Sequence, residues 1–506
     1  MELITTRYKK QILGTLTCFD RIVLTGNLPN YCYPAGMAGY LWENKINFFD
    51  YPDKVAKPLA DQIKQHVENV AETSAVEIKY LNKSGIRKEA LVNEVLEQRG
   101  SHPGLVVILS CVEGCNRFTP WYDKHKKRYS LKTRSGQCLH YYFYFIDELF
   151  GLCYLRVPTW LPCRLQFYFN GHNYLANQLK RNSIGFEMAD NCFTSIDFFE
   201  DANDLAAKIS PADIEQRLRY YVKAFIPAIG QTFNEKYRWS IMQLEVSTDY
   251  VFKDDTTLPG LYDQLTSTAM HTVKIPDVAS FLGFKMPRTR LDNYGSSLKK
   301  TCEGVRLKHN YGKHSVKMYD KFNRVLRIET TSNQVNLFKS RRKVYHRDGS
   351  NSVKNDAPVR KSIHSLPLLF TIMATANRRY HEYISAIEDF SVGRKNLKKV
   401  TAETIENSRK YKGFNFFNEG DEELLLAVFS GAFNVTGFRN QDIKRILNRN
   451  TATTSRAIKR LRAHGLIKKI GNTYKYYVTT LGREVIATAM QLKELYVIPR
   501  LNFIRS

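Results

Sequence analysis

A regular alternation of apolar and polar residues between Gly304 and Asn333 constrains the fold more than any other feature of the chain. Alternation with period two is typical of β-strands that bury one face. Two breaks in the pattern, Asn310-Tyr311-Gly312 and Phe322-Asn323-Arg324, are typical of tight turns. We therefore predict an antiparallel β-meander of three strands, whose apolar face is formed by Val305, Leu307, Val316, Met318, Leu326 and Ile328.

The opposite face of this meander is polar and mostly cationic. Its members are Arg306, Lys308, Ser315, Lys317, Tyr319, Lys321, Arg327, Glu329 and Thr331. In the simplest register, Lys317 lies between Arg306 and Glu329, and Tyr319 lies opposite Arg327. A sheet face with one phenol, one carboxylate and many cations suits phosphate chemistry. We therefore expect phosphate contacts from Arg306, Lys308, Lys317, Lys321 and Arg327, and a catalytic role for Tyr319, Lys321 and Glu329.

The net charge of the chain favours a polyanionic partner. Among 506 residues, 76 lysines and arginines stand against 49 aspartates and glutamates, which gives a formal charge of +27. Each phosphate that a cation neutralises also releases counterions, so this excess stabilises complexes with nucleic acid. The 30 tyrosines and 29 phenylalanines include flat side chains that could stack on unpaired bases, although most are expected in the core. A soluble basic protein without such a partner is the alternative.

Cysteine usage and hydropathy indicate the compartment. The nine cysteines have no paired Cys-x-x-Cys spacing, which indicates free thiols in a reducing environment. The N-terminus lacks an apolar run of signal-peptide length, and no run reaches the length of a membrane span. We therefore expect a cytoplasmic protein without a membrane partner.

Length and pattern together predict a multidomain α+β fold. Strand-like runs alternate with amphipathic helices over 1–200, which predicts an N-terminal α/β domain with partly parallel strand pairing. A central domain over 201–338 would contain the antiparallel β-meander at 304–333. A basic linker and helical connector over 339–420 would lead to a last domain over 421–506.

The segment from Trp121 to Ser135 is rich in aromatic and basic residues and has no apolar period. Two interpretations are open. The segment is an arm that grips a phosphate backbone, or it is a solvated surface hairpin.

Several acidic and imidazole side chains outside the meander could assemble a metal or acid/base site. They are Asp20, His140, Asp147, His172, Glu245 and Asp249. We expect Asp20, His140, Glu245 and Asp249 to be the metal ligands. Glu245 and Asp249 would share a face whether their segment is a helix or a strand. Carboxylates suit a divalent cation such as Mg²⁺ or Mn²⁺. Each residue also has an ordinary interpretation, as a turn residue, a satisfied core histidine or a solvated acidic edge.

The clearest fold signal lies at the C-terminus. Helical patterns over 421–430, 441–447 and 454–463 are followed by a hairpin around Gly471-Asn472. This order resembles the winged-helix domains of MarR-like regulators, in which the third helix enters the major groove. The alternative is a protein-binding or RNA-binding winged helix. The basic residues expected to contact nucleic acid here and in the linker are Arg341, Arg342, Lys343, Arg439, Arg456, Lys459, Arg460, Arg462, Lys468, Lys469 and Lys475.

A second resemblance concerns the meander itself. The sequence Tyr319-Asp320-Lys321, followed by Arg327-Ile328-Glu329, is similar to a YDK strand and an R-x-E strand of rolling-circle replication initiators of small plasmids and filamentous phages. The resemblance implies a nicking domain in which Glu329 is a metal ligand, Lys321 contacts phosphate and a tyrosine such as Tyr319 is the nucleophile. The His-hydrophobic-His pair of related nickases is missing, so His140, His309 or His314 would have to replace it. The order of the whole chain also resembles a group of uncharacterised bacterial proteins that end in a winged helix.

Three functions are compatible with these features. The first is a DNA-processing protein of a mobile element, such as a replication initiator or a transposase-like nickase, with a divalent metal. The second is a non-catalytic winged-helix transcriptional regulator. The third is an RNA-binding component of a ribonucleoprotein. DNA is favoured over RNA, and a homodimer is an open possibility.

Overall fold

The computed structural model divides the chain into two compact units, Met1–Glu388 and Asp389–Ser506. The residues that it describes are 3–82, 85–125, 127–285, 293–301, 304–344, 355–388, 391–431, 433, 437–471 and 473–501. Helices and strands are both abundant, so the fold is mixed α+β, as predicted.

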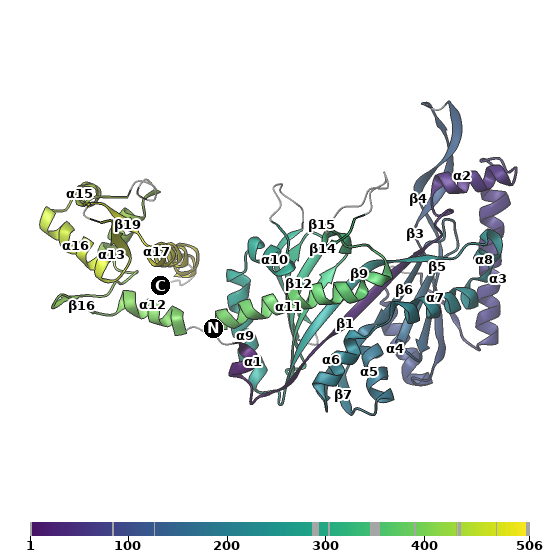
Figure 1. Cartoon of the computed structure of the whole chain (residues 1–506), viewed down its shortest axis with the longest axis horizontal. Coiled ribbons are helices and arrows are strands. Elements are labelled where there is room, and N and C mark those ends of the chain that lie inside the picture. Colours follow the sequence, from purple (N-terminus) through teal and green to yellow (C-terminus); the bar gives the residue numbers. More distant parts are fainter. Residues whose placement is uncertain are drawn as a thin grey trace. The chain divides into compact units, whose positions relative to one another are not determined.

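The first unit is built on a single 11-stranded sheet with the order β10-β11-β12-β13-β9-β1-β6-β5-β4-β3-β2 (Figure 1). Its strands are β1 (Ile12–Asn27), β2 (Ile78–Tyr80), β3 (Gly104–Asp123), β4 (Arg128–Asp147), β5 (Gly151–Pro158), β6 (Leu165–Asn170), β9 (Arg238–Phe252), β10 (Tyr294–Thr301), β11 (Gly304–Tyr311), β12 (His314–Lys321) and β13 (Val325–Ser332). Among the described strands, only β2 and β3 pair in parallel, across the short β2-α4-β3 connection. The expected parallel pairing is confirmed at this edge alone.

Strand β9 joins the N-terminal strands to the meander. β9 pairs with β1 on one side and with β13 on the other, antiparallel in both cases. The boundary expected near residue 200 therefore does not separate two sheets. The reason is that the segment 239–252, whose pattern suited either a helix or a strand, forms the strand that joins the two halves.

Helices cover both faces of this sheet. Their bounds are α1 (Ile4–Arg7), α2 (Pro34–Glu43), α3 (Lys57–Thr73), α4 (Lys88–Arg99), α5 (Gly171–Arg181), α6 (Phe199–Ala207), α7 (Pro211–Phe225), α8 (Pro227–Phe233), α9 (Thr257–Thr272), α10 (Ile275–Leu282) and α11 (Leu366–Glu388). One face packs against α3, α7, α8, α9, α10 and α11. The other face packs against α4, α5, α6 and the small hairpin β7 (Phe186–Ala189) and β8 (Cys192–Ile196).

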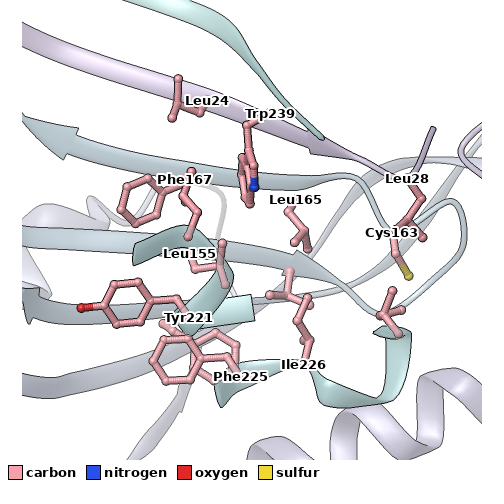
Figure 2. Packing of buried hydrophobic residues seen from close by; sticks show 14 of the residues in the cluster. Leu24, Leu28, Leu155, Cys163, Leu165, Phe167, Tyr221, Phe225, Ile226 and Trp239 are labelled. Atoms are coloured by element: carbon pink, nitrogen blue, oxygen red, sulfur yellow. The ribbon is translucent and has the colours of Figure 1, made fainter. Parts of the chain in front are cut away.

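Alternation along the strands fills the first of these faces with large apolar side chains. Phe167 of β6 and Leu155 of β5 point at Tyr221 and Phe225 of α7 (Figure 2). The Phe143 and Phe225 rings stack with centroids 4.5 Å apart. Full burial of one such side chain stabilises the fold by about 1.5–3 kcal/mol. This apolar layer therefore determines which side chains of each strand point into the core. The polar side chains of the same strands are left on the opposite face.

The second unit contains the C-terminal helices. Its elements are α12 (Ser391–Thr401), β16 (Thr404–Glu406), β17 (Arg409–Tyr411), α13 (Glu419–Phe429), α15 (Asn440–Leu447), α16 (Thr451–Ala463), β18 (Ile467–Lys469), β19 (Tyr476–Val478), α17 (Thr480–Leu492) and α18 (Ile498–Leu501). Three helices followed by a hairpin are the elements that the sequence predicts, packed around one apolar core. Asn472, in the predicted hairpin turn, lies outside the described residues. The winged-helix assignment itself stays a prediction.

Among the described residues, no helix combines the length and the apolar character needed to cross a membrane.

Candidate functional site

The polar face of the meander has the predicted composition. In the observed register, Lys317 is opposite Glu329 on β13 and opposite Lys308 on β11. Tyr319 is opposite Arg327 and Arg306. The expected neighbour of Lys317, Arg306, therefore lies two residues further along β11, opposite Tyr319. The difference arises because the β11–β12 turn is centred on Gly312, in the left-handed region with φ of 60°, and Lys313.

Asp20 reaches this polar face from β1. The β1–β9 register shifts between the Phe19 and Arg21 pairs, so Asp20 is the extra residue of a β-bulge. Helix α5 begins directly against this bulge: a Cβ on Gly171 would lie 2.0 Å from the Phe19 carbonyl oxygen. The absence of a side chain at Gly171 therefore lets the helix approach closely. The next residue, His172, places Nδ1 3.1 Å from the Asp20 carboxylate.

Three carboxylates from three strands converge on the polar face. Asp20, Glu245 and Glu329 each offer an oxygen within 4.8 Å of the others, and all three residues are buried. Lys317 donates to Glu245 at 3.0 Å and also to Glu329. The Thr331 hydroxyl donates to Glu245 at 3.1 Å. We call Asp20, Glu245 and Glu329 the acidic cluster.

An arginine network lies beside the acidic cluster. Arg327, which is 1% exposed, makes a two-pronged contact with Asp249, with both nitrogen–oxygen distances at 2.7 Å. Its guanidinium also lies 3.4 Å from Asp20 and 2.9 Å from Nε2 of His172. Asp249 shares a strand face with Glu245, as expected. Its carboxylate, however, pairs with Arg327 and is not part of the acidic cluster.

Burial and charge shift the acid–base behaviour of this face. Burial, together with Glu245 and Asp20, raises the pKa of Glu329 to about 7 despite the nearby ammonium of Lys317. Burial alone would lower the pKa of Lys317, but Glu329 and Glu245 outweigh it and raise that pKa. Burial and then Glu329 raise the pKa of Tyr319. In contrast, His172 and Arg327 hold the pKa of Asp20 below its usual range against the effect of burial.

The donor set of the acidic cluster fits a hard divalent cation. All three residues offer carboxylate oxygens, which are the ligands that Mg²⁺ and Mn²⁺ prefer. A cation would also relieve the mutual repulsion that contributes to the raised pKa of Glu329. The ammonium of Lys317 already neutralises part of this charge, so a cation would share Glu245 and Glu329 with it or displace it.

The structure keeps His140, His309 and His314 away from the acidic cluster. His140 lies on β4, which β5 and β6 separate from β1, and its Nδ1 is 3.0 Å from the Cys138 carbonyl oxygen. His309 contacts Ser296 and Tyr380, and His314 packs against Phe284 and Phe338. These side chains complete internal packing, so none of the three replaces the missing His-hydrophobic-His pair.

The predicted cations of the first unit divide into buried and accessible groups. Arg327 and Lys317 are buried in ion pairs, and Lys321 is buried against Asn191. They hold the polar face together instead of presenting charge to solvent. Arg306 and Lys308 are half-buried, whereas Arg341 and Lys343 are exposed and Arg342 is half-buried.

In the second unit, most of the predicted contact residues are exposed. These are Arg439, Arg456, Lys459, Arg462, Lys468 and Lys469, with Lys475 half-buried. Arg460 differs, because it binds the Asp421 carboxylate at 2.6 and 2.9 Å and the Lys412 carbonyl oxygen at 2.7 Å. This arginine fixes α16 to the loop after β17 and is not presented to a ligand.

His172, Arg21 and Asn191 complete the site, and the sequence did not single out the last two. Arg21 lies 3.7 Å from Glu245, Asn191 donates to Asp20 at 3.1 Å, and His172 joins Asp20 to Arg327. His172 stood among the candidates by its place at a strand end, without a partner. No local signal identifies Asn191, because the β7–β8 hairpin reaches the site only through the fold. Comparisons with protein-family models, curated proteins and solved structures found no match to the chain.

Proposed function

We propose that this protein cleaves a nucleic acid strand at the acidic cluster, with Tyr319 as the nucleophile. The observation that carries the proposal is the convergence of Asp20, Glu245 and Glu329 on a face that also holds Tyr319. In this proposal the second unit binds duplex DNA through α16 and the β18–β19 hairpin. The protein would then process DNA as replication initiators or transposase-like nickases of mobile elements do.

The reaction transfers a phosphoryl group to tyrosine. A bond forms between the Tyr319 oxygen and phosphorus, and the bond from phosphorus to one sugar oxygen breaks. The phenol proton passes through solvent to that leaving oxygen. A divalent cation on the acidic cluster would polarise the scissile phosphate.

Neighbouring side chains support this role for Tyr319. Because Glu329 contributes to raising the pKa of Tyr319, neutralising the acidic cluster favours the phenolate that attacks. Arg306 is the register neighbour of Tyr319, and its Nε is buried without a hydrogen-bond partner among the described residues. A phosphate oxygen beside Tyr319 would supply that partner.

The test is a nicking assay on supercoiled and single-stranded DNA with Mg²⁺ or Mn²⁺. We expect Tyr319→Phe to abolish a covalent protein–DNA adduct on denaturing gels, and Glu329→Gln to abolish cleavage. Tyr220→Phe is the matched control, since Tyr220 is 63% exposed on α7. An adduct that persists in Tyr319→Phe would rule out this nucleophile.

Metal binding is tested separately from cleavage. Titration of Mn²⁺ by calorimetry should show a site that Glu245→Gln weakens at least tenfold and that His140→Ala leaves unchanged. Equal binding by the wild-type protein and Glu245→Gln would refute the assignment of the acidic cluster.

One observation favours a second function, a non-catalytic DNA-binding regulator. Lys317 lies between Glu245 and Glu329 and satisfies both carboxylates internally, as a purely structural ion pair would. That function requires duplex binding that depends on residues after 436, with no Mn²⁺ site and no cleavage. Sequencing the nucleic acid that co-purifies distinguishes both from an RNA-binding role.

A further inference from the structure

The hairpin of β3 and β4 continues beyond the end of the neighbouring strand β5 as a two-stranded ribbon. β4 pairs with β5 only from His140 onward, whereas β3 and β4 stay paired as far as Asp123 and Arg128. Figure 1 shows this ribbon extending beyond the other strands, near α2. The described residues of the segment Trp121–Ser135, expected to be an arm or a surface hairpin, are thus part of a long β-hairpin, and Lys126 lies outside the described residues. We call residues 117–134 the ribbon.

The ribbon is strongly cationic. Its sequence contains one carboxylate, Asp123, against seven lysines and arginines: Arg117, Lys124, Lys126, Lys127, Arg128, Lys132 and Arg134. Lys124, Lys127, Arg128 and Arg134 are exposed. A ribbon with this charge attracts a phosphate backbone at moderate ionic strength.

The tip of the ribbon also exposes large aromatic rings. Tyr122 and Tyr129 face each other in the register, with centroids 5.2 Å apart, and Phe49 contacts Tyr129 at 5.2 Å. Their exposed fractions are 47%, 52% and 58%. The three rings hold one another in place yet remain open to solvent. Such a patch, surrounded by cations, indicates a partner that offers both flat apolar surfaces and negative charge.

Single-stranded nucleic acid has both properties. Unpaired bases stack on aromatic side chains while their phosphates contact lysine and arginine. In a duplex the base faces are covered by their neighbours, so a duplex could use the cations of the ribbon but not its rings. We infer that the ribbon binds unpaired nucleotides, with bases on Tyr122, Tyr129 and Phe49 and phosphates on Lys124, Lys127 and Arg128. This inference rests on the proposed function and specifies its substrate as a strand with unpaired nucleotides.

The inference is tested by binding, in the full-length protein and without divalent metal. A fluorescein-labelled oligo(dT) and a labelled DNA hairpin duplex are titrated with wild-type protein, Tyr122→Ala/Tyr129→Ala and Tyr122→Phe/Tyr129→Phe. The alanine pair should weaken oligo(dT) binding about tenfold or more, because two rings on which bases stack are lost. The phenylalanine pair should stay within about twofold, since stacking needs the ring and not the hydroxyl. Tyr220→Ala, on α7, is the control for loss of an exposed tyrosine.

Charge is tested by the triple variant Lys124→Ala/Lys127→Ala/Arg128→Ala. It should reduce the slope of log K against log salt for oligo(dT) by about 2, because each lost phosphate contact removes ~0.7 from the slope for single strands. An unchanged slope would remove these cations from the binding surface.

Three results would overturn the inference. One is unchanged oligo(dT) affinity in the alanine pair, and another is an equal loss on the duplex, which would make the ribbon a duplex-binding element. The third is that the alanine pair loses binding to anionic lipid vesicles but keeps its affinity for oligo(dT). Failure of the proposed cleavage is recognised independently, because the wild-type protein would then bind oligo(dT) without cleaving DNA in the nicking assay. If cleavage does occur, Glu329→Gln should lose it and keep oligo(dT) binding.

Discussion

Replacing Arg327 by methionine should strongly destabilise the first unit, although the side chain touches no solvent. Arg327 is 1% exposed and Asp249 is fully buried, so the substitution leaves a carboxylate without its partner in the interior. Breaking a buried ion pair by removing one member typically costs about 3–5 kcal/mol. The contacts of Arg327 with His172 and Asp20 place this substitution at the upper end of that range.

Urea unfolding followed by tryptophan fluorescence measures this effect in the full-length protein. The four tryptophans, Trp42, Trp121, Trp160 and Trp239, all belong to the first unit, so their emission does not report on the second. With an m value of about 3 kcal/mol/M or more, the loss corresponds to a midpoint lower by roughly 1 M. Arg378→Met is the matched control, because Arg378 is 70% exposed and pairs with Glu382 at 3.8 Å on α11. That control should lose less than about 1 kcal/mol.

A second substitution separates charge from packing. Adding Asp249→Asn to Arg327→Met removes the unpaired carboxylate while keeping its volume, so the double variant should be more stable than Arg327→Met alone. A loss below about 1 kcal/mol in Arg327→Met, or no relief from Asp249→Asn, would refute the view that this network holds the polar face together.

Three further predictions follow from the same structure. The pKa of Glu329 is about 7 in the folded protein and 4.5 ordinarily, so the ionised carboxylate opposes folding increasingly as the pH rises through this window. Glu329→Gln should therefore raise the melting temperature more at pH 8 than at pH 4. An equal change in melting temperature at both pH values would contradict the raised pKa. Arg456→Ala/Lys459→Ala should lower the affinity for duplex DNA and reduce the slope of log K against log salt by about 2. Arg460→Ala should instead destabilise the second unit. If Arg460→Ala weakened DNA binding and the double variant lost stability, a different face of α16 would contact DNA. Gly171→Ala should lower the urea midpoint of tryptophan emission, since its Cβ would lie 2.0 Å from the Phe19 carbonyl oxygen, and an unchanged midpoint would mean that α5 shifts without cost.

Local periodicity was sufficient to predict the meander. Strands β11, β12 and β13 lie where alternation places them, and the Lys317–Glu329 and Tyr319–Arg327 pairs are confirmed. The reason is physical: with one face buried against α9, α10 and α11, a slip of one residue would expose every apolar side chain. The three C-terminal helices and their hairpin were predictable for a similar reason, because their caps and stops are local in sequence.

The neighbours of the meander could not be predicted in the same way. β9 suited a helix or a strand by its pattern, and only its pairing with β1 and β13 decides between them. The pairing with β1 joins residues more than 200 positions apart, and no local preference encodes either pairing. Exposure could not be predicted from the sequence either. Arg306 and Arg327 occupy equivalent positions in the alternation, yet Arg306 is half-buried and Arg327 is buried.

Asp20 shows most clearly what a strict alternation misses. Before the bulge, Leu16 and Cys18 pack toward α5 while Phe19 points to the opposite core, and after it Ile22 and Leu24 point to that core. Asp20 and Arg21 together therefore occupy one position of the alternation, and both reach the polar face, toward His172 and Glu245 respectively. Bulges change the direction of side chains in this way beside many active sites. The pattern Phe-Asp-Arg-Ile, with two charged residues between two buried ones, is the sequence signature of this arrangement, and it brings a third carboxylate to a meander that supplies only one.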